Sequence, residues 1–339
     1  MTIKTKKSNL LEKALPFICL IFMIATFINC AIPKKNKKPQ QISWINFDWV
    51  GDSLSNRYFD KLAITIPFSI EGVPHKFISQ FDLGATNTMV YGNSINPYIN
   101  SYPDLFEKLD TVNRTSLLQG KKVGAFKNIN FKLDTVLFKS KRVLYFDEFG
   151  DVFTKDSLHT KTVKHIGTIG ASLFQDKYLI IDFPNHRIAV LDSLTQPYKE
   201  NTTFVAAKLD KGRIKVPVTI NGANHYFMFD TGSSIFPLSV AKKDIQQLSN
   251  THIATDTLNV SSWGEYYDIH GYPINSEISV GDIQLETQNL YVYDSKEDFE
   301  QFYIEEEIMG IMGNTFFLDK EIIIDFKNKR FGIVVNDNN

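Results

Sequence analysis

Hydrophobic residues along this chain recur mostly at every second position, in short segments rich in Val, Ile, Phe and Tyr that end at turn-forming residues. Such alternation is typical of β-strands with one buried face. In the first half we expect strands over residues 62–70, 76–81, 125–133, 143–146, 178–183 and 187–191, with counterparts in the second half. Helical spacing is rare, and its best candidates are residues 104–109 and 240–248. The pattern therefore predicts an all-β fold with few short helices.

The chain also repeats itself. Three blocks of the first half recur in the same order in the second: residues 66–72 as 216–222, residues 81–90 as 229–238, and residues 167–187 as 310–330. The last pair shares two Gly, a Phe and the run Ile-Ile-Asp-Phe-x-Asn-x-Arg. Ordered identity over three separate blocks predicts two copies of one small β-domain related by a pseudo-twofold axis.

These observations divide the chain into four parts. A polar stretch with one Pro, residues 192–204, separates the two copies. We expect an N-terminal lobe over residues 59–195 and a C-terminal lobe over residues 196–339. Residues 30–58 are interpreted as a tether or linker, because residues 31–41 carry four Lys and two Pro without apolar periodicity. Residues 1–29 are interpreted as a signal segment.

The signal segment has a basic start and a short apolar run. Lys4, Lys6, Lys7 and Lys13 precede an uncharged run over residues 14–28, which ends next to Cys30. This run is shorter than the roughly 20 residues that span a bilayer. It resembles a bacterial lipoprotein signal with lipidation at Cys30, although the residues just before Cys30 are larger than usual, so an uncleaved signal anchor stays open. Either interpretation predicts a membrane-tethered body in the bacterial cell envelope, outside the cytoplasm, on its periplasmic or surface side.

The repeated Asp-x-Gly segments carry a family resemblance. The chain has Asp82-Leu83-Gly84 in the first copy and Asp230-Thr231-Gly232-Ser233 in the second, and each copy ends with two apolar or hydroxyl residues before Gly170 and Gly313. This set resembles the aspartic proteases, both pepsin-like and retropepsin-like, over roughly residues 60–335. The resemblance implies a bilobal β-fold with a central cleft, in which polypeptide substrate is hydrolysed.

In that family the two aspartates are the catalytic residues, so the resemblance implies catalysis by Asp82 and Asp230. Two carboxylates held close together cannot both ionise and share one proton. One then activates a water as general base while the other donates a proton to the scissile carbonyl, as in the aspartic protease dyad that illustrates the general principle. This chemistry needs no metal and no cofactor.

The resemblance also assigns loop-supporting roles. The Thr231 hydroxyl is expected to bond across to the opposite loop, the Ser233 hydroxyl to orient the carboxylate, and the glycines to allow close backbone approach; the glycines are Gly84, Gly232, Gly170 and Gly313. The first copy departs from the pattern, because Leu83 stands where a hydroxyl residue is usual. Half of the expected tie between the lobes is therefore missing.

Flap hairpins are expected after each Asp loop. In the first lobe the turn should fall near residues 119–122, where no Tyr is present. The second-lobe hairpin, residues 261–273, is rich in aromatics, so Trp263, Tyr266 and Tyr267 are possible substrate contacts. The alternative is that these side chains pack on their own lobe.

Charge and composition exclude several other classes. The 37 Lys and Arg against 38 Asp and Glu give a net charge of -1, which does not favour a nucleic-acid partner. Two Cys cannot form a disulfide framework, and no spacing typical of a zinc site is present. Asp182 and Asp325, repeated at strand ends with an Arg five residues on, are interpreted as structural turns or ion pairs.

Two function classes remain. One is a membrane-tethered aspartic endopeptidase that acts as a monomer, because both halves of the active site are in one chain. The other is a catalytically inactive protein that binds a peptide or an envelope partner in the same cleft. Leu83 favours the second class, whereas the two Asp and the Asp-Thr-Gly-Ser segment favour the first.

Overall fold

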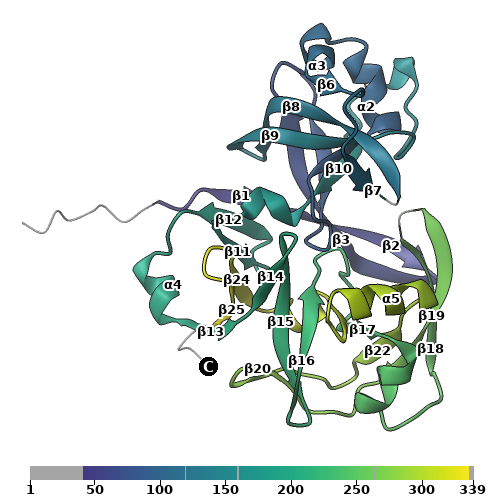
Figure 1. Cartoon of the computed structure of the whole chain (residues 1–339), viewed down its shortest axis with the longest axis vertical. Helices are drawn as coiled ribbons and strands as arrows, with labels where there is room; N and C mark the ends of the chain where they lie inside the picture. The colour runs from purple at the N-terminus through teal and green to yellow at the C-terminus, as the bar shows by residue number, and fades with distance from the viewer. Residues whose placement is uncertain (1–40, 119, 159, 263, 336–339) are drawn as a thin grey trace, which may run out of the picture. The chain divides into compact units, whose positions relative to one another are not determined.

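From residue 42 onward the chain forms mainly β-strands joined by turns and loops, with few short helices (Figure 1). The computed structural model describes residues 41–118, 120–158, 160–262 and 264–335. Cys30, Trp263 and the signal segment lie outside these described residues. The described residues from 42 onward belong to one compact unit.

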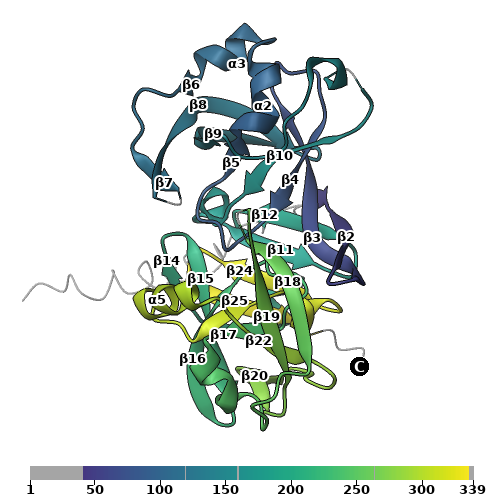
Figure 2. The ribbon, with the colours of Figure 1, turned by 90° about the vertical axis from the view of Figure 1, so that its right-hand side faces the viewer.

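The first half forms a mixed nine-stranded sheet. Its strands, in spatial order, are β2 (Asp48–Leu54), β3 (Arg57–Ile70), β4 (Phe77–Phe81), β10 (Lys164–Ile169), β5 (Met89–Tyr91), β9 (Val136–Phe146), β8 (Lys121–Leu133) and β6 (Leu109–Asp110), with β7 (Ser116–Leu118) paired to β8. Figure 2 shows this sheet above the strands of the second half.

The second half forms a ten-stranded sheet of related design. In spatial order its strands are β18 (Asp256–Ser262), β19 (Glu265–Pro273), β22 (Tyr291–Asp294), β17 (Leu238–Val240), β23 (Gly310–Met312), β16 (Ala223–Phe229), β15 (Arg213–Ile220), β20 (Ile278–Val280) and β21 (Ile283–Gln284), with β14 (Lys208–Asp210) paired to β15.

Both sheets have the same arrangement at the centre. β10 lies between β4, to which it is parallel, and β5, to which it is antiparallel. In the second half β23 lies between β16 and β17 with the same two directions. The outer neighbours also correspond, because β5 pairs parallel to β9 and β17 pairs parallel to β22. This correspondence is the pseudo-twofold repeat that the sequence predicts, and the all-β fold class is confirmed.

A six-stranded sheet joins the two halves. Its order is β1 (Trp44–Asn46), β12 (Arg187–Leu191), β11 (Tyr178–Asp182), β24 (Glu321–Asp325), β25 (Arg330–Val334) and β13 (Thr202–Ala206). The apolar runs of β11 and β24, which come from the repeated Ile-Ile-Asp blocks, pair antiparallel with each other. The repeat thus supplies the strands through which the halves are joined.

The repeated aspartates of this sheet are structural, as the sequence indicates. The Asp182 carboxylate accepts hydrogen bonds from Asn185 and from Arg187 Nε at 2.7 Å. Asp325 repeats the arrangement with Asn328 and Arg330 Nη2 at 2.6 Å. Both carboxylates are almost fully buried, so their charges require these partners.

The boundary of the tether needs correction. Residues 42–58, which the sequence placed in a linker, form β1 and β2 and the turn into β3. β1 pairs with β12, and β2 pairs with β3 through six residues with one irregularity. The alternation in this segment is short and interrupted by charged residues, so it gave no clear strand signal.

Helices are short and lie outside the sheets. They are α2 (Gly92–Ile99), α3 (Pro103–Glu107), α4 (Gln196–Glu200) and α5 (Glu297–Glu305), with 3₁₀ turns at Lys155–Ser157, Ala171–Phe174, Lys242–Gln247 and Thr315–Phe317. The expected helix at residues 104–109 is close to α3. The one at 240–248 is a 3₁₀ turn after the end of β17. In the described residues no helix is both long enough and apolar enough to cross a bilayer.

Candidate active site

The two Asp-x-Gly segments leave the sheets at equivalent places. Asp82 follows β4, and its amide donates a hydrogen bond of 3.1 Å to the carbonyl of Ile169 in β10. Asp230 follows β16, and its amide donates to the carbonyl of Met312 in β23 at 2.9 Å. Each aspartate is therefore fixed at its backbone by the central strand of its own sheet.

The glycines after the central strands allow this arrangement. A Cβ atom on Gly313 would lie 1.9 Å from the carbonyl oxygen of Ser233, and one on Gly170 would lie 2.5 Å from the carbonyl oxygen of Asn87. These separations are far inside van der Waals contact. A side chain at either position would push the Asp loop off the central strand.

One hydroxyl ties the two loops together. Thr231 Oγ1 donates to the carbonyl oxygen of Phe81 at 2.9 Å and accepts from the amide of Leu83 at 3.0 Å. Thr231 is fully buried. The first lobe donates no equivalent side-chain bond, because Leu83 has no hydroxyl. Its side chain is 1% exposed and belongs to the main hydrophobic core. The tie is thus one-sided, as the sequence indicates.

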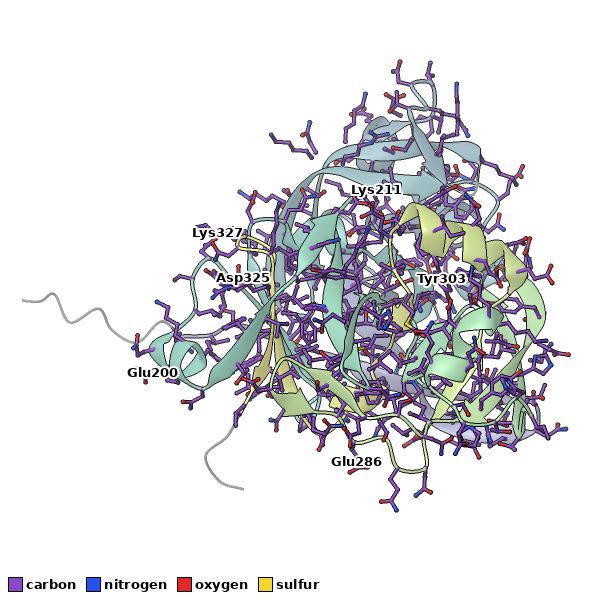
Figure 3. The ribbon with its side chains drawn as sticks, turned by 60° about the horizontal axis from the view of Figure 1, so that its bottom comes forward. Glu200, Lys211, Glu286, Tyr303, Asp325 and Lys327 are labelled. Atoms are coloured by element: carbon purple, nitrogen blue, oxygen red, sulfur yellow. The ribbon has the colours of Figure 1, made fainter. Side chains whose placement is uncertain are left out.

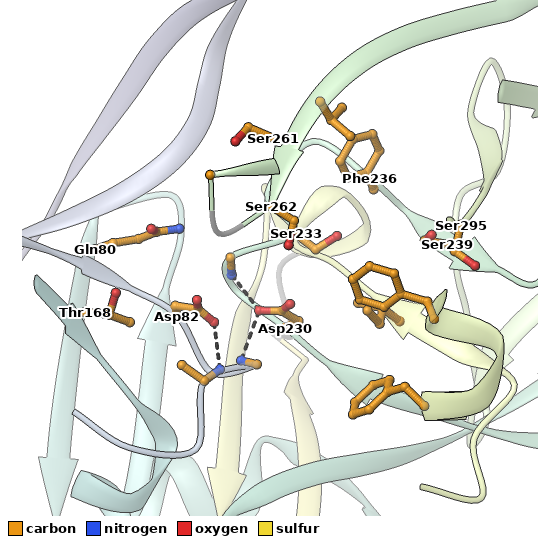
Figure 4. A pocket seen from close by; sticks show the side chains of 18 of the residues that line it. Gln80, Asp82, Thr168, Asp230, Ser233, Phe236, Ser239, Ser261, Ser262 and Ser295 are labelled. Carbon is orange, nitrogen blue, oxygen red and sulfur yellow. Dashed lines mark hydrogen bonds between the residues drawn. The ribbon is translucent and has the colours of Figure 1, made fainter. Parts of the chain in front are cut away.

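The carboxylates lie against each other's loops (Figure 4). Asp230 Oδ1 accepts from the amide of Gly232 at 2.7 Å and from the amide of Gly84, in the opposite loop, at 3.0 Å. Asp82 Oδ1 accepts from the amide of Ala85 at 2.9 Å. A Cβ on Gly84 would lie 2.5 Å from the Asp230 carboxyl carbon, and one on Gly232 would lie 2.9 Å from that of Asp82. Only glycines permit the two carboxyl groups to come this close.

The environment separates the two carboxyl groups chemically. Burial and the charge of Asp230 hold the pKa of Asp82 well above its usual range, against the effect of the Ala85 amide. Burial also raises the pKa of Asp230, but amide hydrogen bonds and the Asp82 carboxyl oppose the shift. The pair therefore retains a proton. We place it on Asp82, because Asp230 receives two amide hydrogen bonds that stabilise its anion and Asp82 receives one.

The hydroxyl that supports the second-lobe loop is not the expected one. Ser233 lines the cavity, but its hydroxyl makes no hydrogen bond to Asp230. Instead Ser234 Oγ donates to the carbonyl of Thr231 at 2.9 Å, and Asn314 Nδ2 donates to the same carbonyl at 3.0 Å. The sequence gives no signal for Asn314, because its bond to the Thr231 carbonyl crosses 83 residues of sequence. Ser234 bonds locally to Thr231, but the sequence does not show which of the two neighbouring serines turns inward.

The pair opens into a cavity of about 990 Å³ whose walls come from both halves. On the first-lobe side Gln80, Thr168 and His165 lie on its wall, and the Tyr91 hydroxyl is hydrogen-bonded to Thr168. Burial raises the pKa of Tyr91 to about 12, so this wall presents neutral hydroxyl groups near Asp82. The cavity exceeds what one side chain fills, and its size suits an extended chain segment.

The second-lobe hairpin covers this cavity. Residues of β18 and β19 line it, including Ser261, Ser262 and Tyr267. Tyr266 is 77% exposed and is not on the cavity wall, so only one of the two described flap tyrosines faces the pair. The first-lobe turn between β7 and β8 falls at the predicted place, but β7 contributes no residue to the wall.

The N-terminal hairpin braces the covering hairpin. Arg57 Nη2 contacts Asp256 Oδ2 at 2.7 Å, and Ser55 Oγ accepts from the amide of Asn259 at 2.8 Å. Leu54 and Phe59 pack in the same apolar cluster as Leu258. The first lobe therefore holds the base of the flap that the second lobe supplies.

No group of three or more His, Cys, Asp or Glu side chains is placed to hold a metal ion within the described part of the chain. The acid–base pair and the cavity are the chemical features at this site.

Comparison with known proteins supports the same interpretation for one half. Residues 216–316 match a family model described as an aspartyl protease. The matched segment includes Asp230 and Gly313, whereas Asp82 lies outside it. This match supports an aspartic protease family and a protease-like function for the chain. No curated protein matches the sequence.

We predict that Thr231→Val destabilises the fold by about 2–4 kcal/mol, because it leaves the Phe81 carbonyl and the Leu83 amide buried without partners. Chemical denaturation measures the loss. Thr88→Val is the matched control, since Thr88 Oγ1 accepts a single bond, from the amide of Gly170 within one lobe. A Thr231→Val protein as stable as the wild type would show that the tie between the loops is not needed.

We also predict that Asp82→Asn becomes more stable than the wild type as the pH rises. Because the folded-state pKa of Asp82 is raised, its proton stabilises the wild type below about pH 4 and this contribution is lost as the pH rises through the folded-state pKa. The amide cannot ionise, so the melting-temperature difference should grow from pH 4 to pH 8. Asp319→Asn, at an exposed site beside Lys320, should follow the wild type. Parallel curves for Asp82→Asn and the wild type would contradict the assignment.

Proposed function

We propose that this chain is an aspartic endopeptidase that hydrolyses peptide bonds with a water activated between Asp82 and Asp230. The observation that carries the proposal is the mutual placement of the two carboxyl groups, each within reach of the opposite Asp-x-Gly loop at the base of a large cavity. A pair with one proton in such a place is suited to concerted acid and base catalysis.

The roles follow from the unequal hydrogen bonding of the two carboxyl groups. The Asp230 carboxylate removes a proton from the water as its oxygen attacks the carbonyl carbon of the substrate. The Asp82 carboxyl group donates its proton to the carbonyl oxygen. A tetrahedral diol results, with the shared proton now on Asp230. Asp230 then donates its proton to the amide nitrogen while Asp82 takes a proton from a hydroxyl of the diol. The C–N bond breaks, the carboxylic acid and amine products form, and the pair returns to its starting state.

The amides around Asp230 make it the base. Two backbone N–H groups, those of Gly84 and Gly232, point at its Oδ1 and stabilise the anion. Asp82 Oδ1 receives one amide bond, from Ala85. The cross-lobe bond from Gly84 ties the ionisation of the second-lobe carboxyl group to the position of the first-lobe loop.

A non-catalytic binding protein is the second candidate. The observation that favours it is Leu83, since the first loop lacks the hydroxyl that would complete the tie. In that case the same cavity holds a peptide or envelope partner without cleaving it. Activity measurements separate the two functions.

We predict that Asp82→Asn and Asp230→Asn each lower kcat by about three orders of magnitude or more, because neither variant can share a proton. The full chain in detergent is incubated with a peptide library between pH 3 and pH 8. Wild-type activity should fall at high pH, as Asp82 loses its proton, and at low pH, as Asp230 gains one. Asp319→Asn is the control.

Near-normal turnover by either dyad variant would contradict the mechanism. A wild type that binds peptides without cleaving them at any pH would instead support the non-catalytic function.

We also propose that the protein is attached to the bacterial cell envelope through a lipid on Cys30. The support is the short uncharged run that ends beside this residue. We predict that a fatty-acid analogue labels the wild type and Cys19→Ser but not Cys30→Ser, because Cys19 lies inside the segment to be removed. Labelling of Cys30→Ser would refute lipidation, and an unlabelled, membrane-bound wild type would favour a signal anchor.

A further inference from the structure

One positively charged side chain lies on the wall of the cavity among the described residues. Arg213, the first residue of β15, lines it on the second-lobe side, and 12% of its side chain is exposed. Its Nη2 donates to Glu306 Oε1 at 2.6 Å, and no other hydrogen bond joins the guanidinium to a described residue. The guanidinium therefore has donors that no described residue uses, among them the buried Nε.

Glu306 does not neutralise Arg213 completely. This carboxylate directly follows α5, is 3% exposed, and also contacts Lys211 Nζ and Lys215 Nζ, each at 3.0 Å. Burial alone would raise its pKa, but the hydrogen bonds from the two lysines and the charge of Arg213 lower it to about 2. Glu306 is thus an anion that three cations surround.

The charges of this cluster leave a positive excess. Lys215 also contacts Asp210, at 3.3 Å, so three cations face two carboxylates. Lys211 and Lys215 are absent from the cavity wall as the described residues define it. Figure 3 shows Lys211 near α5, the helix that carries Tyr303. Arg213 is therefore the member of the cluster through which the excess charge reaches the cavity.

The wall beside Arg213 is apolar. Met228 and Ile311 line it from the sheet, and Phe299 and Phe302 line it from α5. The guanidinium carbon lies 5.2 Å from the centre of the Phe302 ring. A cation next to such a wall is poorly solvated, so it binds a carboxylate more strongly than an exposed cation would.

Another acid on the cavity wall does not neutralise Arg213. Asp298 also lines the cavity, but its carboxylate is 78% exposed and contacts Lys296 at 2.9 Å. The charge of Arg213 does act on Asp230, where it partly offsets the effect of burial on the pKa. Arg213 and the two aspartates line the same cavity, so a substrate bound there can reach both.

We propose that the second-lobe half of the cavity is a subsite for an acidic substrate side chain, with Arg213 as its specificity-determining residue. The inference rests on the proposed peptidase function, because it takes the cavity to be the substrate cleft. The stem of a Glu side chain packs on the Phe302 side of the wall, and its carboxylate accepts from the guanidinium. A neutral isostere leaves the remaining guanidinium donors without a charged acceptor and is disfavoured.

The test compares matched peptides that carry Glu or Gln at each position flanking the cleaved bond. For the full-length wild type we expect kcat/KM about tenfold or more higher with Glu at one position on one side of the bond. In Arg213→Met the ratio should fall to about one, and Arg213→Lys should restore part of it. Lys211→Met is the matched control, because it removes a cation from Glu306 but not from the cavity wall, and it should keep the wild-type ratio.

Several results would overturn the proposal: no preference for Glu at any position in the wild type, a ratio unchanged in Arg213→Met, or an equal loss in Lys211→Met. If Arg213→Met does not fold, the wild-type and Arg213→Lys ratios decide.

Binding of the same peptides to Asp82→Asn, measured by calorimetry, separates this proposal from the peptidase function. Tighter binding of the Glu peptide without any cleavage by the wild type would reject the peptidase and retain the acidic subsite. Cleavage by the wild type with equal binding of both peptides would reject only the subsite.

Discussion

The structure of the site depends on the close approach of two loops whose carboxyl groups would otherwise repel each other. The Thr231 hydroxyl donates one hydrogen bond to the first-lobe loop and accepts one from it. The Gly84 amide of the same loop donates to the Asp230 carboxylate. These bonds hold together two partly buried acids that would repel each other if both were ionised. The retained proton is thus a structural requirement as well as a chemical one.

The two lobes contribute unequally to this contact. The second lobe provides the hydroxyl, the ionised carboxylate and the covering hairpin, whereas the first provides Leu83, the protonated carboxyl group and the brace at Arg57. Leu83 is not an empty place in the pattern, since its side chain fills the core below the loop. The symmetry of the backbone is therefore kept while the side chains of the two copies have diverged.

The sequence predicts the parts of this protein that repeat. Asp82, Asp230, Gly170 and Gly313 are found from the internal alignment, because backbone proximity restricts what can stand there. Ser234, not Ser233, supports the loop, through the Thr231 carbonyl rather than the carboxylate, and a local pattern does not show which of two neighbouring hydroxyls turns inward. α5 and Arg213 have no counterpart in the first copy, so the repeat gives no signal for the wall that they form.

The hairpin of β2 and β3 also covers one edge of the ten-stranded sheet. β18 is the terminal strand there, so one of its sides has no neighbouring strand. Ser55 Oγ accepts a hydrogen bond from the amide of Asn259 on this strand. Leu54 packs in the same apolar cluster as the buried side chains of β18. Uncovered edge strands of this kind pair readily with strands of other chains. The β2–β3 hairpin thus also covers this edge against self-association, and its removal would expose a surface for aggregation.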